Sequence, residues 1–272
     1  MKRPVDIEDL LRWAYRDELP KVEADQSVEG IGPQSGSMWG GVSQMGEEMA
    51  AAVHDGRPNV YGLLPSHNPF EQPINPDALI IGEAVNALDY VGFTLPADWS
   101  PFADMPGLGA DAEWLTDAAR QRLVQDSGFV RVEARRLVIR FAILGDRREW
   151  ECEPIRRGWL SYANGAPRWF RRVLVDDGFG GAVEIEVDGY NKRGKRPFTD
   201  AFRKPVFDPS PNTVAEARAE YQVWHAAMAY LAARLDGCLS DFAVSGPARP
   251  WAPWEGGGMP ERRILPMLVK GA

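Results

Sequence analysis

Residues 169–188, WFRRVLVDDGFGGAVEIEVD, decide the fold class of this chain. Two runs rich in Val, Ile and aromatic residues, 169–175 and 182–188, flank a glycine-rich connection. This pattern predicts a β-hairpin. In the second run aliphatic residues alternate with acidic ones, so we expect one face of the hairpin to be buried and the other to face water.

Helical spacing of apolar residues occurs on both sides of this hairpin. The clearest segment begins at Asn212 or Thr213 and keeps one apolar face as far as Gly237. Earlier helical segments are 6–16, about 40–54, one that starts at Asn75, about 110–125, and about 132–144. We therefore predict an α+β fold that is mostly α, with a helical body, a small antiparallel β-hairpin and a long C-terminal helix.

The domain organisation follows from these segments. We expect a single domain over 1–246, with the hairpin inserted near 168–190. Residues 247–272 are rich in Pro, Trp and Gly and predict a tail. Such a tail is either laid on the body of the protein or docks onto a protein partner.

The composition narrows the class of protein. With 44% hydrophobic and 26% charged residues, the chain resembles an ordinary globular protein. No run reaches the roughly 18 apolar residues of a membrane span, and the first residues lack the apolar core of a signal peptide. The two cysteines, Cys152 and Cys238, make no zinc-binding pattern, and no dinucleotide fingerprint occurs. We expect a cytoplasmic protein with no membrane partner and no cofactor.

Charge is distributed unevenly along the chain. Residues 1–130 carry 8 basic and 21 acidic side chains, whereas residues 131–204 carry 17 basic and 11 acidic ones. The basic middle segment indicates an anionic partner. Packing of the acidic N-terminal part against this segment explains the same pattern, and charge alone does not separate the two interpretations.

Within the middle segment, a basic loop directly follows the hairpin. The residues that we expect to contact nucleic acid are Arg171, Arg172, Lys192, Arg193, Lys195 and Arg196. A hairpin that presents such a loop is suited to phosphate contacts, with DNA or a nucleoprotein complex as the partner. Nearby aromatic residues, Trp159, Tyr162 and Trp169, can stack on bases. The alternative is a solvated loop without a partner.

Three acids on the second strand form an alternative candidate site. Glu184, Glu186 and Asp188 alternate, so they share one face of the strand and can gather a hard cation such as Mg²⁺. A metal held beside basic residues would suit phosphodiester cleavage. The other interpretation is that these carboxylates pair with Arg171 and Arg172 across the hairpin.

A helix-turn-helix is a further hypothesis. Helices at about 110–125 and 132–144, joined through Gly128, have suitable lengths, and four arginines lie in or beside the second one: Arg131, Arg135, Arg136 and Arg140. An ordinary antiparallel pair of helices would have the same pattern.

Several stretches resemble a known group of proteins. These are Val5 to Arg16 near the start, Asp188-Gly189-Tyr190, Arg203-Lys204, Asp208-Pro209, Tyr221 to His225, and Pro250-Trp251. Together they resemble uncharacterised proteins encoded in prophage-like regions of alphaproteobacterial genomes. The resemblance implies a mobile-element context, and it implies no defined activity and no functional residue.

Three functional hypotheses follow. The leading one is a non-enzymatic accessory protein of a phage or mobile element that binds nucleic acid or a nucleoprotein through the basic segment 156–204. The second is a divalent-metal-dependent phosphodiesterase that uses the three acids of the hairpin. The third is a structural protein that docks onto other proteins through its tail.

Overall fold

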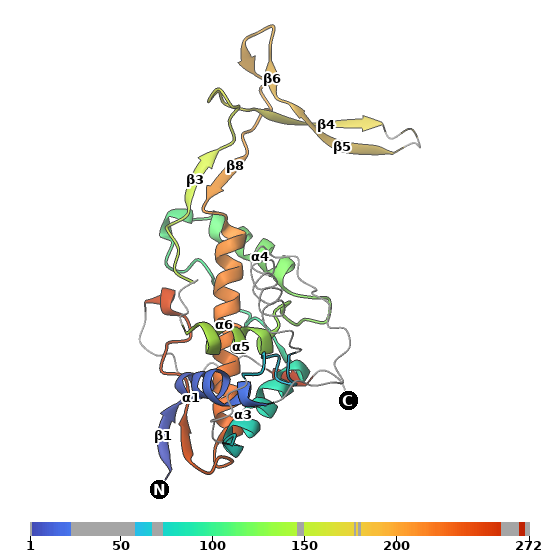
Figure 1. Cartoon of the computed structure of the whole chain (residues 1–272). Helices are drawn as coiled ribbons and strands as arrows, with labels where there is room; N and C mark the ends of the chain where they lie inside the picture. Colours follow the sequence, from blue (N-terminus) through green and yellow to red (C-terminus); the bar gives the residue numbers. More distant parts are fainter. Residues whose placement is uncertain are drawn as a thin grey trace. The chain divides into compact units, whose positions relative to one another are not determined.

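The computed structural model describes residues 2–22, 58–66, 73–145, 150–176, 178, 181–256 and 267–269. Helices and small sheets together make a mixed α+β fold, as the sequence predicts at that level (Figure 1). The chain divides into two compact units. The first comprises Met1–Trp99, Arg120–Trp150 and Ala217–Ala272, and the second comprises Ser100–Ala119 and Glu151–Glu216. The helix expected at about 40–54 lies outside the described residues.

The first unit begins with a strand and a capped helix. β1 (Arg3–Asp6) leads into α1 (Ile7–Trp13), and the carboxylate of Asp6 accepts a hydrogen bond from the backbone N–H of Glu8 at 2.8 Å. This cap confirms the helix start expected from the sequence. The chain continues as a π-helical turn (Ala14–Glu18) and a 3₁₀ turn (Leu19–Lys21). α1 contacts α5 (Ala134–Leu144), which ends at Gly145 in a left-handed conformation with φ 85°.

α3 (Pro76–Asn86) begins where the Asn-Pro-Asp sequence predicts a helix start. The side chain of Asn75 accepts a hydrogen bond from the backbone N–H of Asp77 at 2.8 Å. Asp77 is itself buried, and its two carboxylate oxygens accept from the backbone N–H groups of Ser240 and Asp241, each at 2.8 Å. This carboxylate therefore ties the start of α3 to the turn that follows α6 (Pro211–Leu235). A 3₁₀ turn (Ala87–Tyr90) follows α3.

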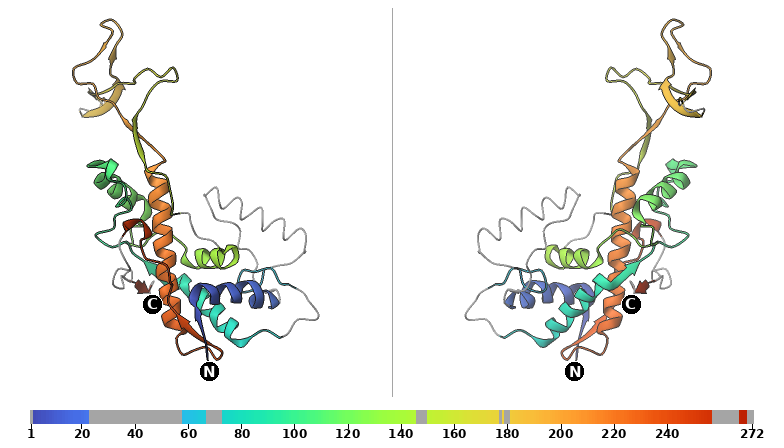
Figure 2. Two further views of the ribbon diagram at one scale, coloured as in Figure 1. Left: turned by 90° about the vertical axis from the view of Figure 1, so that its left-hand side faces the viewer. Right: turned by 90° about the vertical axis from the view of Figure 1, so that its right-hand side faces the viewer.

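Residues 217–235 of α6 carry the core of the first unit. Trp224, Met228 and Leu231 are each at most 2% exposed. The ring of Phe141 on α5 meets that of Trp224 edge-on, with centroids 6.4 Å apart. Figure 2 shows α1, α3 and α5 grouped around this stretch of α6. Burial of these large apolar side chains supplies most of the driving force for folding of the unit.

Two small sheets connect distant parts of the chain within this unit. β1 pairs in parallel with β9 (Phe242–Ser245), and β2 (Val91–Phe93) pairs antiparallel to β10 (Met267–Val269). Neither pairing was predicted from the sequence. A three- or four-residue strand has too short a pattern to be recognised without its partner.

The first part of the tail lies on the first unit. The carbonyl oxygen of Pro250 accepts from the hydroxyl of Tyr221 at 2.9 Å, and that of Arg249 accepts from Nε2 of His225 at 2.9 Å. Trp251 and Trp254 are both buried, the latter in a 3₁₀ turn (Pro253–Glu255). These contacts favour the laid-down arm over the docking segment for residues 249–255. The predicted boundary at 246 stays a prediction.

The second unit is built mainly from three antiparallel strand pairs. β3 (Arg156–Trp159) pairs with β8 (Pro205–Asp208), β4 (Phe170–Asp176) with β5 (Ala182–Asp188), and β6 (Tyr190–Asn191) with β7 (Arg196–Pro197). The β4–β5 pair confirms the predicted hairpin. Part of α4 (Asp111–Leu123), a 3₁₀ turn (Pro106–Leu108) and the first residues of α6 also belong to the unit.

The base of the hairpin is fixed by a close backbone approach. The backbone N–H groups of Phe170 and Phe202 each donate to the carbonyl oxygen of the other residue, at 2.9 and 2.7 Å. A β-carbon at position 189 would lie 2.7 Å from the backbone of Phe170, so only glycine fits there. Gly189 thereby allows the chain to turn from β5 into β6.

The burial predicted for the hairpin is wrong. On the aliphatic face of β5, Val183 is 52% exposed and Ile185 is 42% exposed. The predicted alternation itself is present: Val183 and Ile185 lie on one face of the hairpin, and Glu184 and Glu186 lie on the other. The aliphatic side chains stay exposed because, among the described residues of the second unit, no helix or second sheet covers their face.

No helix among the described residues is both long enough and apolar enough to cross a membrane.

Candidate nucleic-acid interface

Four of the six predicted site residues lie in one tight turn. Lys192, Arg193 and Lys195 lie between β6 and β7, and Arg196 begins β7 opposite Asn191. The side-chain oxygen of Asn191 accepts hydrogen bonds from the backbone N–H groups of Arg193 and Gly194, both at 3.0 Å. This arrangement is an Asx turn, in which a side chain replaces a backbone acceptor. We call residues 191–196 the basic turn.

The conformation of the basic turn also depends on Lys195. Its φ is +50°, which makes it the one described residue other than glycine with positive φ. A lysine in this left-handed conformation costs roughly 1 kcal/mol relative to glycine. The turn therefore keeps a positive charge at a position where backbone geometry favours a different residue.

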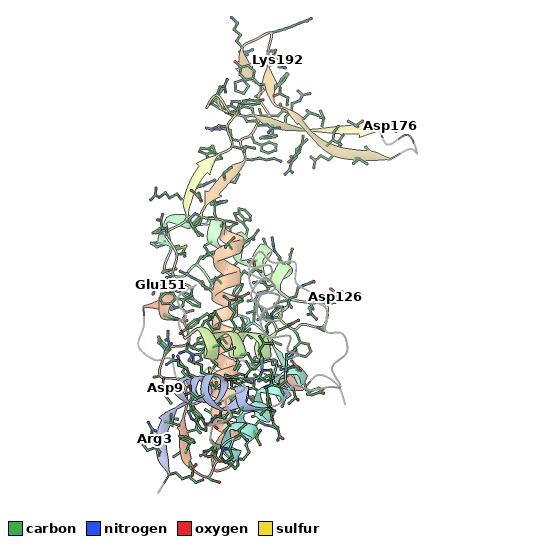
Figure 3. The ribbon with its side chains drawn as sticks, in the orientation of Figure 1. Arg3, Asp9, Asp126, Glu151, Asp176 and Lys192 are labelled. Carbon is green, nitrogen blue, oxygen red and sulfur yellow. The ribbon has the colours of Figure 1, made fainter. Side chains whose placement is uncertain are left out.

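Solvent surrounds the side chains of the basic turn. Lys192, Arg193, Lys195 and Arg196 are all exposed. None of them forms an ion pair with any residue that the structure describes. Figure 3 shows Lys192 at the outer end of the β6–β7 turn. The nearest acid before the turn, Asp188, uses one carboxylate oxygen to accept from the N–H of Tyr190 at 3.0 Å.

Arg171 and Arg172 lie apart from the basic turn, on β4. Because they are consecutive on a strand, their side chains point to opposite faces. The guanidinium of Arg171 lies 4.3 Å from the ring centroid of Phe198. That of Arg172 lies 5.5 Å from the centroid of Phe202 and 3.8 Å from a carboxylate oxygen of Glu184. The positive charge of Arg172 is therefore partly compensated within the hairpin.

Two of the three acids on β5 pair with basic residues. A carboxylate oxygen of Glu184 lies 3.8 Å from the guanidinium of Arg172, diagonally across the hairpin, and the carboxylate of Glu186 accepts a hydrogen bond from the ammonium of Lys204. Across the described parts of the chain, no group of three side chains of the metal-binding kind comes together. Glu184, Glu186 and Asp188 do share one face, and ion pairs with Arg172 and Lys204 engage the first two of them.

Stacking of cations on aromatic rings is the feature that sequence reasoning missed. Trp159 has the guanidinium of Arg157 at 4.9 Å and that of Arg203 at 5.2 Å from its ring centroid. Phe170 has Arg168 at 5.0 Å and Lys204 at 4.7 Å. The interleaving of arginine with aromatic residues was visible in the sequence, but their pairing depends on how the strands meet.

A hollow of about 320 Å³ lies along the β3–β8 pair. Arg156, Arg157, Trp159 and Asp208 are among its lining residues. Arg157 pairs with Asp111 at 3.2 Å, and Arg156 lies 4.0 Å from Glu153. Acids therefore balance the cations here, in contrast to the basic turn. The Arg157–Asp111 pair is one contact of the kind expected if acidic residues pack against the basic segment.

No protein-family model, curated protein or solved structure matches this chain.

Two of the four arginines of the helix-turn-helix hypothesis are engaged by other side chains. Arg135 pairs with Asp89 at 2.8 Å, and the guanidinium of Arg140 lies 4.8 Å from the ring centroid of Phe141. Arg131 and Arg136 are exposed. Within the described residues, the basic turn is thus the densest group of cations that lacks acidic partners.

Proposed function

We propose that this protein is a non-enzymatic accessory protein that binds nucleic acid, alone or in a nucleoprotein, through the basic turn. The observation that carries the proposal is a run of four exposed cations without an acidic partner among the described residues. The resemblance of the sequence to prophage-encoded proteins suggests a phage or other mobile element as the setting, and this setting is part of the same proposal.

The physical argument rests on charge density. Four like charges within six residues repel one another, and phosphate groups relieve that repulsion while releasing counterions. The Asx turn formed by Asn191 holds the backbone of the loop, so less conformational entropy is lost on binding. Contacts of this kind position a nucleic acid without reading its sequence. We expect weak, sequence-independent and strongly salt-dependent binding.

Two exposed aromatic residues, one on β3 and one just after it, offer further stacking surfaces in the second unit. Trp159 and Tyr162 are each 45% exposed. Exposed rings offer stacking surfaces to unpaired bases and none to a closed duplex. Tighter binding of single strands than of duplexes would therefore indicate that these rings take part.

The proposal includes a cytoplasmic setting and leaves out the other two functional hypotheses. The two cysteines, Cys152 and Cys238, are both exposed and form no disulfide, which supports a cytoplasmic setting. The metal-dependent phosphodiesterase is not what we propose, because Glu184 and Glu186 are engaged by Arg172 and Lys204. Nor do we propose docking through the tail, because Trp251 and Trp254 are buried.

Fluorescence anisotropy with labelled 20-mers tests the proposal. The variant K192Q/R193Q/K195Q/R196Q removes the four charges of the basic turn. The matched control R3Q/R122Q/R131Q/R136Q removes four exposed charges elsewhere. We expect the first variant to lose binding to single- and double-stranded DNA and the control to retain most of it. Equal affinity of the first variant and the unmodified protein would contradict the proposal.

A further inference from the structure

The outer edge of β4 has an unusual order of side chains. From Arg172 to Asp176 the strand reads RVLVD, a cation and an anion separated by three aliphatic residues. Two of the three aliphatic residues are exposed, Leu174 at 73% and Val175 at 44%, and Val173 is half-buried. Read in the opposite direction, the order of charges is reversed and the apolar centre is unchanged.

This edge of β4 also has free backbone hydrogen-bonding groups. The N–H and carbonyl groups of Phe170 bond to Phe202, which places them on the side of β4 away from β5. Backbone groups two residues apart on a strand point to the same side. The N–H and carbonyl groups of Arg172, Leu174 and Asp176 therefore point outward as well. Among the described strands only β5 pairs with β4 over residues 171–176 (Figure 1).

We propose that β4 pairs antiparallel with β4 of a second copy of this chain, about a two-fold axis at Leu174. In this register Leu174 faces the same residue of the other copy. Val173 faces Val175, and Arg172 faces Asp176, each twice. Opposite charges and apolar residues that lie directly across an antiparallel pair stabilise it. The result is a four-stranded sheet, which is a more stable unit than an isolated two-stranded hairpin.

The order of charges favours this partner and this register over the alternatives. An axis at Arg172 would place two arginines opposite each other, and an axis at Val175 would place Leu174 opposite Asp176. Pairing between two copies of β5 about Ile185 would place Glu184 opposite Glu186. Because like charges directly across strands destabilise a sheet, the β4 edge is the self-complementary one. The two-fold interface uses the same residues from both copies.

The pairing extends the aliphatic face of the hairpin. Val173 and Val175 of β4 share that face with Val183, Ile185 and Val187 of β5, as the register shows. In the four-stranded sheet the faces of the two copies become continuous. A dimer formed in this way carries two basic turns, but the proposal does not rest on nucleic-acid binding.

A charge-reversal experiment on the full chain tests the register. Sedimentation velocity over a range of concentrations measures the dimer dissociation constant. R172D and D176R each place like charges opposite each other, and R172D/D176R restores opposite charges. We expect each single variant to weaken the dimer by about tenfold or more, and the double variant to recover most of that loss. A monomeric unmodified protein, or a double variant as weak as the single ones, would overturn the proposal.

Cross-linking gives a second test that does not depend on how a charge reversal affects folding. In a C152S/C238S background, L174C places two cysteines across the axis with Cα atoms about 5.5 Å apart, within the range of a disulfide. I185C, at the middle of β5, is the matched control. Under oxidation we expect a covalent dimer from L174C and none from I185C. Failure of L174C to cross-link, or equal cross-linking of both variants, would overturn the proposed pairing.

Discussion

The side-chain oxygen of Asn191 accepts a hydrogen bond from the backbone N–H of Arg193 at 3.0 Å. The same oxygen accepts from Gly194 at the same distance. A single uncharged side chain thereby holds the backbone on which four cations are displayed. The shape of the basic turn and its charge can therefore be changed independently.

Asn191→Ala removes the acceptor and leaves every charge of the basic turn in place. Loss of hydrogen bonds worth about 0.5–1.5 kcal/mol should weaken DNA binding by roughly 2- to 10-fold. Anisotropy titrations at low salt measure the change. Asn164→Ala is the control, because Asn164 makes a similar bond to Ala166 at 3.1 Å in a turn without cations. If both variants bind as the unmodified protein does, the conformation of the basic turn does not contribute to binding.

Local parts of the fold could be predicted from the sequence. The starts of α1 and α3 were expected from Asp6 and from Asn75-Pro76, because capping depends on residues within one turn. The hairpin was expected from alternation within each strand. The parallel pairing of β1 with β9 was not predicted, because its two strands are short and more than 230 residues apart in the sequence.

The candidate site was predictable to the extent that it is local. Lys192, Arg193, Lys195 and Arg196 are near neighbours in the chain, so their clustering follows from the turn. Arg171 and Arg172 were expected to join them, but their positions depend on contacts with Phe198 and Phe202. Those contacts arise only when the segment after β7 returns to the base of the hairpin, and no local pattern encodes that return.

Asp77→Ala should destabilise the first unit. The substitution removes the acceptor for two backbone N–H groups at 2.8 Å in a buried position, so we expect a loss of about 2–3 kcal/mol in the free energy of unfolding. Urea denaturation followed by circular dichroism measures the loss. Asp17→Ala, at an exposed position, should change stability by less than about 0.5 kcal/mol. Equal stabilities of the two variants would contradict the role assigned to Asp77.

His225 should make stability depend on pH. Burial lowers the pKa of His225 below its ordinary value of 6.5, and the hydrogen bond to the carbonyl oxygen of Arg249 opposes that shift in part. Below pH 6.5 the unfolded chain binds a proton that the folded protein resists, so stability is lost as pH falls through this range. Above pH 6.5 the contribution is constant.

The variant His225→Gln isolates this effect, because glutamine can donate to the same carbonyl but does not titrate. Midpoints of urea unfolding at pH 7.5 and pH 5.5 give the comparison. We expect the unmodified protein to lose more stability on acidification than the variant does. His54 and His67 are present in both proteins, so their titration cancels. An identical pH dependence would contradict the account of His225.

The salt dependence of DNA binding tests the central claim most directly. The logarithm of the binding constant is measured against the logarithm of salt concentration for the unmodified protein, for K192Q/R193Q/K195Q/R196Q and for R3Q/R122Q/R131Q/R136Q. If each cation of the basic turn neutralises one phosphate, the slope should become shallower by about 3–4 in the first variant. The control should keep a slope parallel to that of the unmodified protein. Parallel slopes for all three proteins would contradict phosphate binding by the basic turn.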